Sequence, residues 1–372
     1  MTSMRRLKTK LAAWAVIVMA GLLPQAASAL DYGKPGEPIH LVVAHPCCYA
    51  EVWSVFANAG KELWKKHLPA GSTVEYMVGL QGAVVVNQML AGKAHVGYMG
   101  DLPAFTATTK TQAADVRIVA STAMAYDQCY AFLVRKDAPD FKTADEALKW
   151  VDGKTVATPK GSCTDDFVQK LFKRTGTEPS SYLNQNIEVI SSGFKSGRLD
   201  AAAVWEPNAS NLVAEGLARR VASGATIGEM DGGFVVMQAD LIKQRPDVAK
   251  AWLEAELDAQ LWMADPKNAP EMVGIVKSRV RGFTDKGLHD AIYGAYPKEW
   301  GGSDVRLYLP YAITKDVNDL VDRGVAFLKA NKVINVDKLR ADAIEPTLTA
   351  EVLKGRGLTS PIGEVRAAPA SN

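Results

Sequence analysis

The chain has 372 residues, 48% of them hydrophobic, and a formal net charge of +2. This hydrophobic content is typical of a globular protein, and the length suits two lobes of ordinary domain size better than one small core. A chain this close to neutrality has no electrostatic case for binding nucleic acid or an acidic membrane. We therefore expect no nucleic-acid partner.

Residues 1–29 have the three parts of a secretory signal peptide. A basic start is followed by an apolar stretch from Leu11 to Leu23, and then by Ala27-Ser28-Ala29. The basic residues are Arg5, Arg6, Lys8 and Lys10. Cleavage after Ala29 removes these four cations and no acid, which changes the net charge from +2 to −2. The pattern predicts Sec export, although the paired arginines leave twin-arginine export open. Because no cysteine near the cleavage site can accept a lipid, we expect a free protein in the periplasm.

From residue 39 onward, strand-like runs alternate with helix-like runs, which predicts α/β layering with a largely parallel sheet. Strands are predicted at 39–44, 74–78, 96–99 and 116–120. A second set of strands is predicted in CYAFLVRKD, KTVATPKG, IEVI and AAAVWEP, with a helix over 164–174. A return strand at 234–237 precedes a long helix, whose apolar residues recur at spacings of four and three.

This order predicts two βα lobes joined by two crossings, near Tyr126 and near Gly232. We assign a signal peptide to 1–29, lobe 1 with a helical C-terminal extension to 30–125 and 233–359, and lobe 2 to 126–232. The end, 360–372, is rich in Ala, Pro and Ser and is predicted to be disordered. The glycines of Asp231-Gly232-Gly233 are expected to act as a hinge. Ligands of open α/β sheets bind beyond the carboxyl ends of strands, so we expect the site in the cleft between the lobes.

Four stretches resemble one known family. They are NQMLAGKAHVGYMGDLPA, YAFLVRKDAP, SGRLDAAAVWEP and VVMQADLIKQRPDVAKAWLEAELDA. Their order and spacing resemble the taurine, aliphatic-sulfonate and nitrate binding proteins of ABC importers, a family that also contains the pyrimidine synthase of yeast thiamine biosynthesis. The resemblance covers roughly residues 39–270. It implies the type II periplasmic-binding fold, in which two lobes on a two-segment hinge close on a ligand. It also implies a monomer that delivers its ligand to a membrane permease with an ATPase.

The sequence departs from the family where the ligand is expected. His45-Pro46-Cys47-Cys48 follows the first strand, and Cys163 stands where the family more often has Ser or Thr. The turn before the helix at 164 has free backbone N–H groups, so Ser162, Cys163 and Thr164 are predicted to hold an acidic group of the ligand. The alternative is that Ser162 only caps that helix.

Glu206 follows a predicted buried strand, where the family commonly has an acid that faces the cleft. A carboxylate there suits an ammonium or amide donor, although it also suits the first turn of a helix opened by Pro207. Eight further residues in loops or at the first crossing are predicted to contact the ligand: His45, Cys48, Tyr49, Gln81, Gly82, Asp101, Asp127 and Trp205. The alternative is that they only form loops, cap helices or pack in the core. The predicted rim holds acids and no arginine, so a zwitterionic or amine-bearing ligand fits better than bare nitrate or sulfate.

The four cysteines allow several arrangements. A disulfide between Cys129 and Cys163 is predicted, because Cys129 opens the first strand of lobe 2 and Cys163 follows the next strand of that lobe at its cleft end. Cys47 and Cys48 are then a vicinal pair. A Cys48–Cys163 bond would tie the lobes together. A third possibility is a soft-metal site made by all four cysteines with His45.

The leading hypothesis is a binding protein that is not an enzyme and needs no cofactor or metal. The alternatives are a thiamine-pyrimidine synthase-like enzyme on the same fold and the soft-metal-binding protein. That enzyme uses a Cys-Cys-Cys-Phe-Cys run for iron and a lysine for pyridoxal phosphate, and the sequence does not contain that run. A Ser/His/Asp triad, a phosphate loop and a dinucleotide fingerprint cannot be argued from the sequence either.

Overall fold

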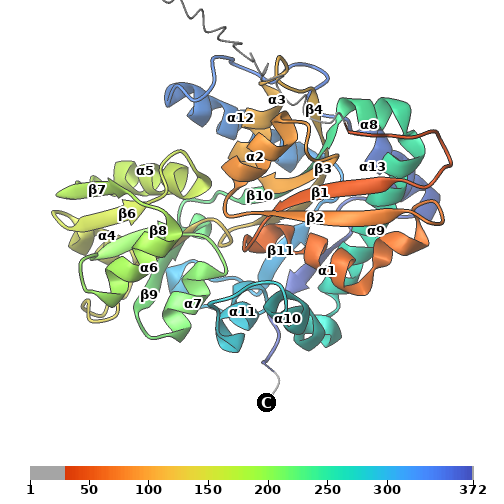
Figure 1. Cartoon of the computed structure of the whole chain (residues 1–372). Helices are drawn as coiled ribbons and strands as arrows, with labels where there is room; N and C mark the ends of the chain where they lie inside the picture. Colours follow the sequence, from red (N-terminus) through yellow and green to blue (C-terminus); the bar gives the residue numbers. More distant parts are fainter. Residues whose placement is uncertain (1–29, 371–372) are drawn as a thin grey trace, which may run out of the picture.

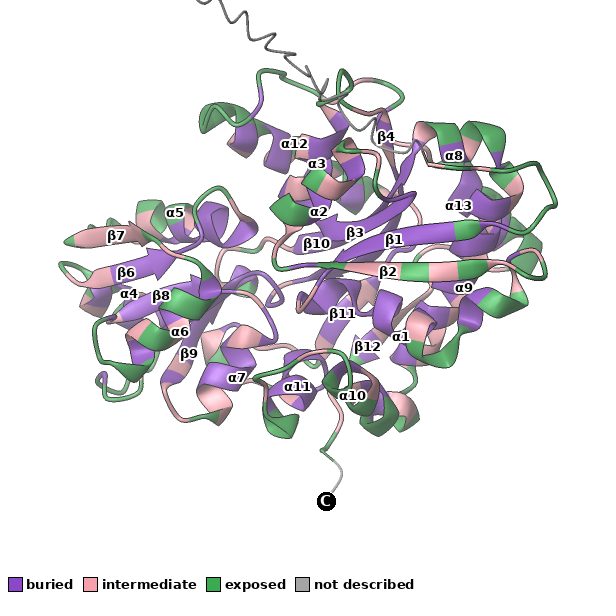
Figure 2. Ribbon diagram, in the orientation of Figure 1, coloured by how far each residue is buried: buried purple, intermediate pink, exposed green. Residues whose placement is uncertain are grey.

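A computed structural model describes residues 30–370, so the predicted signal peptide lies outside the described residues. Two separate sheets divide this part of the chain into two lobes (Figure 1). The larger sheet has the strand order β12-β11-β4-β10-β3-β1-β2, and the smaller has the order β7-β6-β8-β5-β9. Buried residues fill the inner strands of both sheets, such as β1, β3 and β8, whereas the edge strands β2 and β7 are largely intermediate or exposed (Figure 2).

Lobe 1 begins with the four strands expected from the sequence. They are β1 (His40–Pro46), β2 (Thr73–Gly79), β3 (Val96–Gly100) and β4 (Val116–Ala125). The helices between them are α1 (Ser54–Lys61), α2 (Gly82–Leu90) and α3 (Asp101–Thr108). β1 pairs in parallel with β2 and β3, so the carboxyl ends of these three strands meet at one edge of the sheet. That edge faces lobe 2 (Figure 1).

Lobe 2 contains five strands and four helices. The strands are β5 (Ala131–Arg135), β6 (Thr155–Thr158), β7 (Ser181–Asn184), β8 (Ala201–Val204) and β9 (Ala218–Ser223). The helices are α4 (Ala144–Val151), α5 (Cys163–Thr175), α6 (Ile187–Lys195) and α7 (Asn208–Ala214). The strand predicted at IEVI is wrong, because this segment opens α6. Asn186 accepts a hydrogen bond from Val189 N at 2.9 Å and so caps that helix.

The chain crosses between the lobes at residues 126–130 and 224–230. The first crossing lies where it was expected. The residues Asp231-Gly232-Gly233, where the sequence predicted a hinge, lie at the start of β10 (Asp231–Gln238), which pairs with β3 and β4. A Cβ atom on Gly233 would collide with Thr122 Oγ1, so this glycine serves close packing. The second crossing instead holds Gly228, with a φ of 70°.

The remaining chain returns to lobe 1. It forms α8 (Ala239–Gln244), α9 (Pro246–Ala264), α10 (Ala269–Lys277), α11 (Asp285–Ile292), β11 (Val305–Leu309), α12 (Lys315–Ala330), α13 (Thr347–Arg356) and β12 (Gly363–Arg366). The tail is therefore not only helical, because β11 and β12 extend the larger sheet. The disorder predicted from 360 is wrong for 360–370: β12 pairs antiparallel with β11 and buries Val365.

The C-terminal part also touches lobe 2 directly. Asn211 of α7 accepts a hydrogen bond from Thr284 N at 2.8 Å, just before α11. Ser223 Oγ, at the end of β9, donates to Gly301 O at 2.7 Å. Figure 1 shows α7, α11 and α10 in a row along one side of the molecule. The lobes are therefore joined by this row as well as by the two crossings.

Candidate functional site

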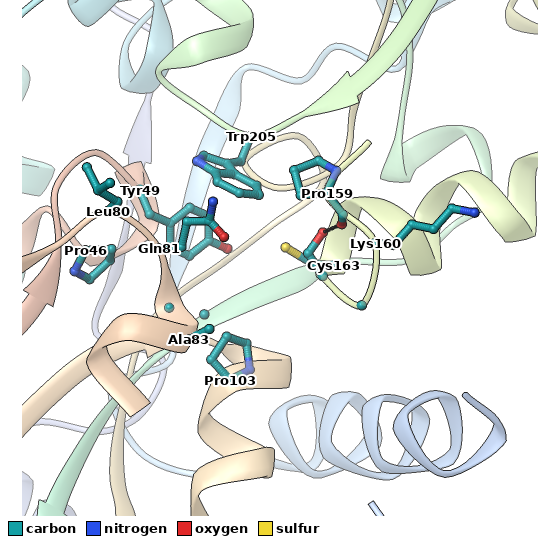
Figure 3. Close-up of a pocket in the computed structure, with 14 residues that line it drawn as sticks. Pro46, Tyr49, Leu80, Gln81, Ala83, Pro103, Pro159, Lys160, Cys163 and Trp205 are labelled. Atoms are coloured by element: carbon teal, nitrogen blue, oxygen red, sulfur yellow. Dashed lines mark hydrogen bonds between the residues drawn. The ribbon is translucent and has the colours of Figure 1, made fainter. Parts of the chain in front are cut away.

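A small cavity of about 140 Å³ lies between the lobes (Figure 3). Lobe 1 contributes Pro46, Tyr49, Leu80, Gln81, Gly82, Ala83, Gly100 and Pro103; lobe 2 contributes Pro159, Lys160, Gly161, Ser162, Cys163 and Trp205. The loops after β1, β2 and β3 meet those after β6 and β8 here. The cavity therefore lies at the strand ends between the lobes, where the sequence analysis expects the ligand.

The N-termini of α2 and α5 both reach this cavity, one from each lobe. Among the described residues, the N–H groups of Gly82 and Ala83 in α2 have no hydrogen-bond acceptor, and the same is true of Cys163 and Thr164 in α5. Neither helix has a side-chain cap, although Gln81 and Ser162 occupy the capping positions. Free N–H groups and the positive ends of two helix dipoles make this cavity a suitable site for an anionic group.

Local contacts hold both helix starts in place. At α2, a Cβ atom on Gly82 would lie 2.6 Å from Pro103 Cγ, so only glycine lets the two segments approach this closely. At α5, Ser162 Oγ donates to Pro159 O at 2.5 Å and lies 2.7 Å from Thr164 Oγ1. These contacts are local, so Ser162 does not cap α5. Thr164 is buried behind the cavity and also contacts Thr158.

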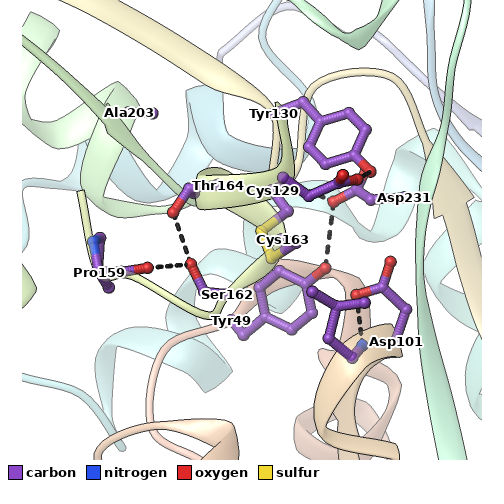
Figure 4. Close-up of a disulfide and its surroundings, with 12 residues drawn as sticks. Tyr49, Asp101, Cys129, Tyr130, Pro159, Ser162, Cys163, Thr164, Ala203 and Asp231 are labelled. Atoms are coloured by element: carbon purple, nitrogen blue, oxygen red, sulfur yellow. Dashed lines mark hydrogen bonds between the residues drawn. A yellow bond between two sulfur atoms is a disulfide. The ribbon is translucent and has the colours of Figure 1, made fainter. Parts of the chain in front are cut away.

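All four cysteine sulfurs are in disulfides. Cys129 of the first crossing is bonded to Cys163 of α5, with the Cα atoms 6.0 Å apart, as the sequence predicted (Figure 4). Cys47 and Cys48 form the vicinal pair. A soft-metal site needs thiolates, and these pairings leave none. Within residues 30–370, no group of three or more His, Cys, Asp and Glu side chains has a geometry that could hold a metal ion.

Aromatic side chains form the walls of the cavity. Tyr49 lies on the side of lobe 1 and Trp205 above it on the side of lobe 2 (Figure 3). Lys160 is among the lining residues, but its ammonium lies 4.4 Å from the centre of the Tyr182 ring and points away from the cavity (Figure 3). An acidic ligand group in this cavity would therefore be held by N–H groups, and an ammonium group by aromatic faces.

Two of the predicted acids do not face the cavity. Glu206 is fully buried and bonded to Arg220 and to Ser210, while Asp127 pairs with Arg306 at 3.0 Å. This placement does not support the prediction that Glu206 holds a ligand amine, because protein groups already bond to its carboxylate. Burial raises the pKa of Glu206, and Arg220 acts in the opposite direction. The expectation that no arginine lies near these acids is also wrong.

A second group of acids lies directly behind Tyr49. Glu51 and Asp231 are fully buried, and Asp101 is 1% exposed. Tyr49 Oη contacts Glu51 and lies 3.2 Å from Asp231 Oδ2, which also accepts the N–H of Cys129 at 2.5 Å (Figure 4). These acids contact hydroxyl and N–H groups instead of cations. Burial, followed by the charge of the neighbouring acid, raises the pKa of Glu51 and of Asp231 well above the usual range.

Asp101 opens α3, and its Oδ1 accepts a hydrogen bond from Leu102 N at 2.7 Å. Burial raises the pKa of Asp101 to about 7. Asp101 does not line the cavity, but it lies close to Tyr49 in Figure 4. We call Glu51, Asp101, Asp231 and the Tyr49 hydroxyl the carboxyl cluster.

Among the predicted site residues, Tyr49, Gln81, Gly82, Ser162, Cys163 and Trp205 line the small cavity. Cys48 lines a second cavity beside it. His45 is turned away from both: its ring is buried, its centre lies 5.0 Å from that of the Phe56 ring, and its Nδ1 donates a hydrogen bond to Pro46 O at 2.9 Å. Burial lowers the pKa of His45. The prediction that it contacts ligand is not supported by this placement.

Sequence reasoning missed the partners of the acids. Arg220 lies in β9 and Arg306 in β11, and neither strand was predicted. The sequence of β11, VRLYL, begins with an alternation of apolar and polar residues that could have indicated a strand, whereas ARRVAS of β9 has no such alternation. Glu51 and Asp231 are close in the sequence to residues that were predicted to contact the ligand or to form the hinge. Nothing in the sequence indicated that these two acids lie close together.

Two mixed α/β lobes that close over a cavity at their strand ends define the type II periplasmic-binding fold. Residues 36–277 match the NMT1-like family, and the chain belongs to that family. No helix among residues 30–370 is long and apolar enough to cross a membrane.

Comparison with individual proteins agrees with this assignment. The chain is 24% identical over 216 residues to the taurine-binding periplasmic protein of Escherichia coli (strain K12); the match covers 55% of this chain and 64% of that protein. The alkanesulfonate-binding protein SsuA from Xanthomonas axonopodis pv. citri, bound to MOPS, has a TM-score of 0.66 at 17% identity, covering 84% of this chain and 99% of that one. The desulfurization enzyme DSZB has a TM-score of 0.59 at 14% identity, covering 86% and 100%. The fold therefore serves binding proteins and at least one enzyme.

Proposed function

We propose that this protein is a periplasmic solute receptor that binds a small zwitterionic or amine-bearing molecule between its lobes and delivers it to an ABC permease with its ATPase. The observation that carries the proposal is the pair of facing helix starts, α2 from one lobe and α5 from the other, whose N–H groups have no acceptor among the described residues. An acidic group held there contacts both lobes at once and so favours their closure. The taurine-binding and alkanesulfonate-binding relatives support a sulfonate as that group.

The amine is assigned to the aromatic side of the cavity. An ammonium group between Tyr49 and Trp205 would meet two ring faces, which attract cations. The Glu206 carboxylate no longer serves this role, because it is paired with Arg220. Taurine, which joins a sulfonate to an amine, is the simplest molecule with both features.

The proposal includes no chemical step. Of the residues that line the cavity, only Tyr49 and Lys160 have ionisable side chains apart from the disulfide-bonded Cys163, and the Lys160 ammonium points away. A nucleophile with an adjacent base is the usual requirement for covalent catalysis. Nuclear magnetic resonance of taurine kept with the protein would reveal any turnover, and a changed taurine spectrum would favour an enzyme.

Binding can be tested by thermal shift and titration calorimetry on the chain that begins at residue 30. A ligand that binds only the folded protein raises its midpoint temperature with concentration. We expect taurine to bind, ethanesulfonate to bind more weakly because it lacks the amine, and nitrate to bind weakest. Absence of any shift with all three would contradict the proposed function. Nitrate binding more tightly than taurine would contradict the zwitterion assignment.

A further inference from the structure

A second, larger cavity of about 510 Å³ adjoins the small one. The two share Leu80, Gln81 and Trp205 in their linings, so they adjoin at these three residues. The second cavity is lined by the Cys47–Cys48 disulfide of lobe 1, by residues of α6 and α7 of lobe 2, and by residues 279–283 between α10 and α11. The proposed function uses none of these groups.

Several polar side chains of this cavity have no protein partner. Within the described part of the chain, the side chains of Ser191, Asn208 and Gln81 make no hydrogen bond, although each lines the cavity and none is fully exposed. Side chains of this kind can bind a ligand without first breaking a protein contact. A polar extension of the ligand would therefore meet free donors and acceptors as it leaves the small cavity.

The charges of the second cavity favour an anion. Lys195 and Glu215 pair with each other at 3.2 Å, so they largely cancel. Arg279 bonds only to Ile275 O and the Ser278 hydroxyl, and Arg281 has no partner among residues 30–370. Of the two acids in this lining, Glu188 is the one without a cationic partner in the part of the chain that the structure describes. Two uncompensated guanidinium groups against one carboxylate leave the cavity with a positive balance.

We propose that the ligand is elongated and has a second anionic group, which binds in the larger cavity near Arg279 and Arg281. Its first acidic group lies at the starts of α2 and α5, and its middle passes Trp205. The Cys47–Cys48 disulfide and Phe283 give that middle part nonpolar contact. This inference rests on the proposed function, because it extends the ligand that the small cavity binds.

Three sulfonates separate the two proposals. Taurine is short and fills only the small cavity. HEPES and PIPES are longer, and both carry an ethanesulfonate on a piperazine ring; the second arm ends in a hydroxyl in HEPES and in a second sulfonate in PIPES. We expect PIPES to bind about three- to ten-fold more tightly than HEPES at low ionic strength, and this preference to shrink as salt is added.

Single substitutions locate the second anion. Arg281→Gln should abolish most of the preference for PIPES and leave taurine binding unchanged. Glu188→Gln should increase the preference, because it removes the opposing charge. Arg198→Gln is the matched control: Arg198 is exposed, lines neither cavity and should change nothing. All three residues are exposed, so the variants should fold.

Each outcome has a defined meaning. If taurine binds but PIPES binds no more tightly than HEPES, this inference is overturned and the proposed function stands. Equal losses for taurine and PIPES in Arg281→Gln also overturn it, because the arginine would then act only through general charge. If none of the three sulfonates binds, the proposed function fails and this inference fails with it.

Discussion

Arg306 of β11 and Asp127 of the first crossing form a buried ion pair, with Nη2 of the arginine 3.0 Å from Oδ2 of the aspartate. Beside it, Tyr296 lies between Arg306 and Arg220, with the guanidinium carbons 4.7 Å and 4.1 Å from the centre of its ring. Arg220 in turn pairs with Glu206. The C-terminal part of the chain is thereby fixed to lobe 2, so any lobe movement must either carry this network along or break it.

Removing Arg306 should therefore be costly. Arg306→Met leaves Asp127 buried without its cation, and we expect the free energy of unfolding to fall by about 3–5 kcal/mol. Adding Asp127→Asn should recover part of this loss, but not all of it, since Arg306 also donates to Ala291 O and Asp290 O. Urea denaturation of the chain from residue 30 measures these differences.

The control for this prediction is Arg366→Met, which breaks an exposed pair with Glu364. Such pairs contribute about 0–1 kcal/mol, so its unfolding free energy should remain close to that of the unaltered protein. A cost below about 1 kcal/mol for Arg306→Met would contradict the structural role of the network.

The carboxyl cluster predicts that stability falls as pH rises. Asp101 has a folded pKa of about 7 against an unfolded value of about 3.9, so the unfolded chain releases its proton first. The contribution of Asp101 to the free energy of unfolding is complete below about pH 4 and is lost between about pH 4 and pH 7. Within that range, one such group lowers the free energy of unfolding by roughly 1.4 kcal/mol per pH unit. Glu51 and Asp231 act in the same direction.

Asp101→Asn isolates this effect, because an amide oxygen can still accept the N–H of Leu102. The variant should match the unaltered protein near pH 4 and be more stable than it at pH 8, in thermal unfolding across that range. Glu351→Gln, at an exposed position, should follow the unaltered protein at every pH. Equal stability of Asp101→Asn and the unaltered protein at pH 8 would show that Asp101 ionises normally.

The two disulfides should differ greatly in their contribution to stability. Cys129 and Cys163 are separated by 34 positions, and closing a loop of this length restricts the unfolded chain by about 3–4 kcal/mol. Cys47 and Cys48 are adjacent, so their bond closes almost no loop. Replacing Cys129 and Cys163 by Ser should lower the unfolding free energy by about that amount, and replacing Cys47 and Cys48 should change it far less.

Peptide mapping without reduction should recover the 129–163 link in exported protein. Equal stabilities of the two double variants would contradict the loop-length argument. The first variant should also bind taurine more weakly, because the disulfide holds the start of α5 against the first crossing.

The sequence predicted the elements that have strong local signals and missed those fixed by distant contacts. The apolar runs of β1 and β3 are buried on both faces, so their composition alone identifies them. In contrast, IEVI has strand-like composition, but it opens α6, where Asn186 caps the first turn and Ile187, Ile190 and Phe194 are buried. β12 has ordinary loop composition and becomes a strand because β11 offers it an edge.

The same distinction applies to the site. Gln81, Gly82, Ser162 and Cys163 follow strand ends, and strand ends are visible in the sequence. Whether an acid is free to face the cavity depends on whether a cation pairs with it. The cations here, Arg220 and Arg306, lie in strands that are fixed by pairing with distant strands, so the sequence did not reveal them. Local patterns therefore predicted the place of the cavity but not its charge.

The final prediction concerns Gly82, at the start of α2. An alanine Cβ there would lie 2.6 Å from Pro103 Cγ and 3.0 Å from Pro103 Cβ, so either α2 or α3 must shift. We expect Gly82→Ala to lower stability by about 1–3 kcal/mol, as overpacking usually does. It should also weaken taurine binding by at least about ten-fold, since the shift moves the N–H groups of Gly82 and Ala83 away from the cavity.

Gly274→Ala is the matched control, because Gly274 lies in α10 with no heavy atom within 4 Å of an added Cβ. Helix propensity favours alanine there by up to about 1 kcal/mol, so this variant should be as stable as the unaltered protein or more so, with the same affinity for taurine. Calorimetric titration of both variants separates the two effects. If Gly82→Ala loses stability but keeps its affinity, the start of α2 packs the lobe without holding the ligand, and the anion must then be bound by α5 alone.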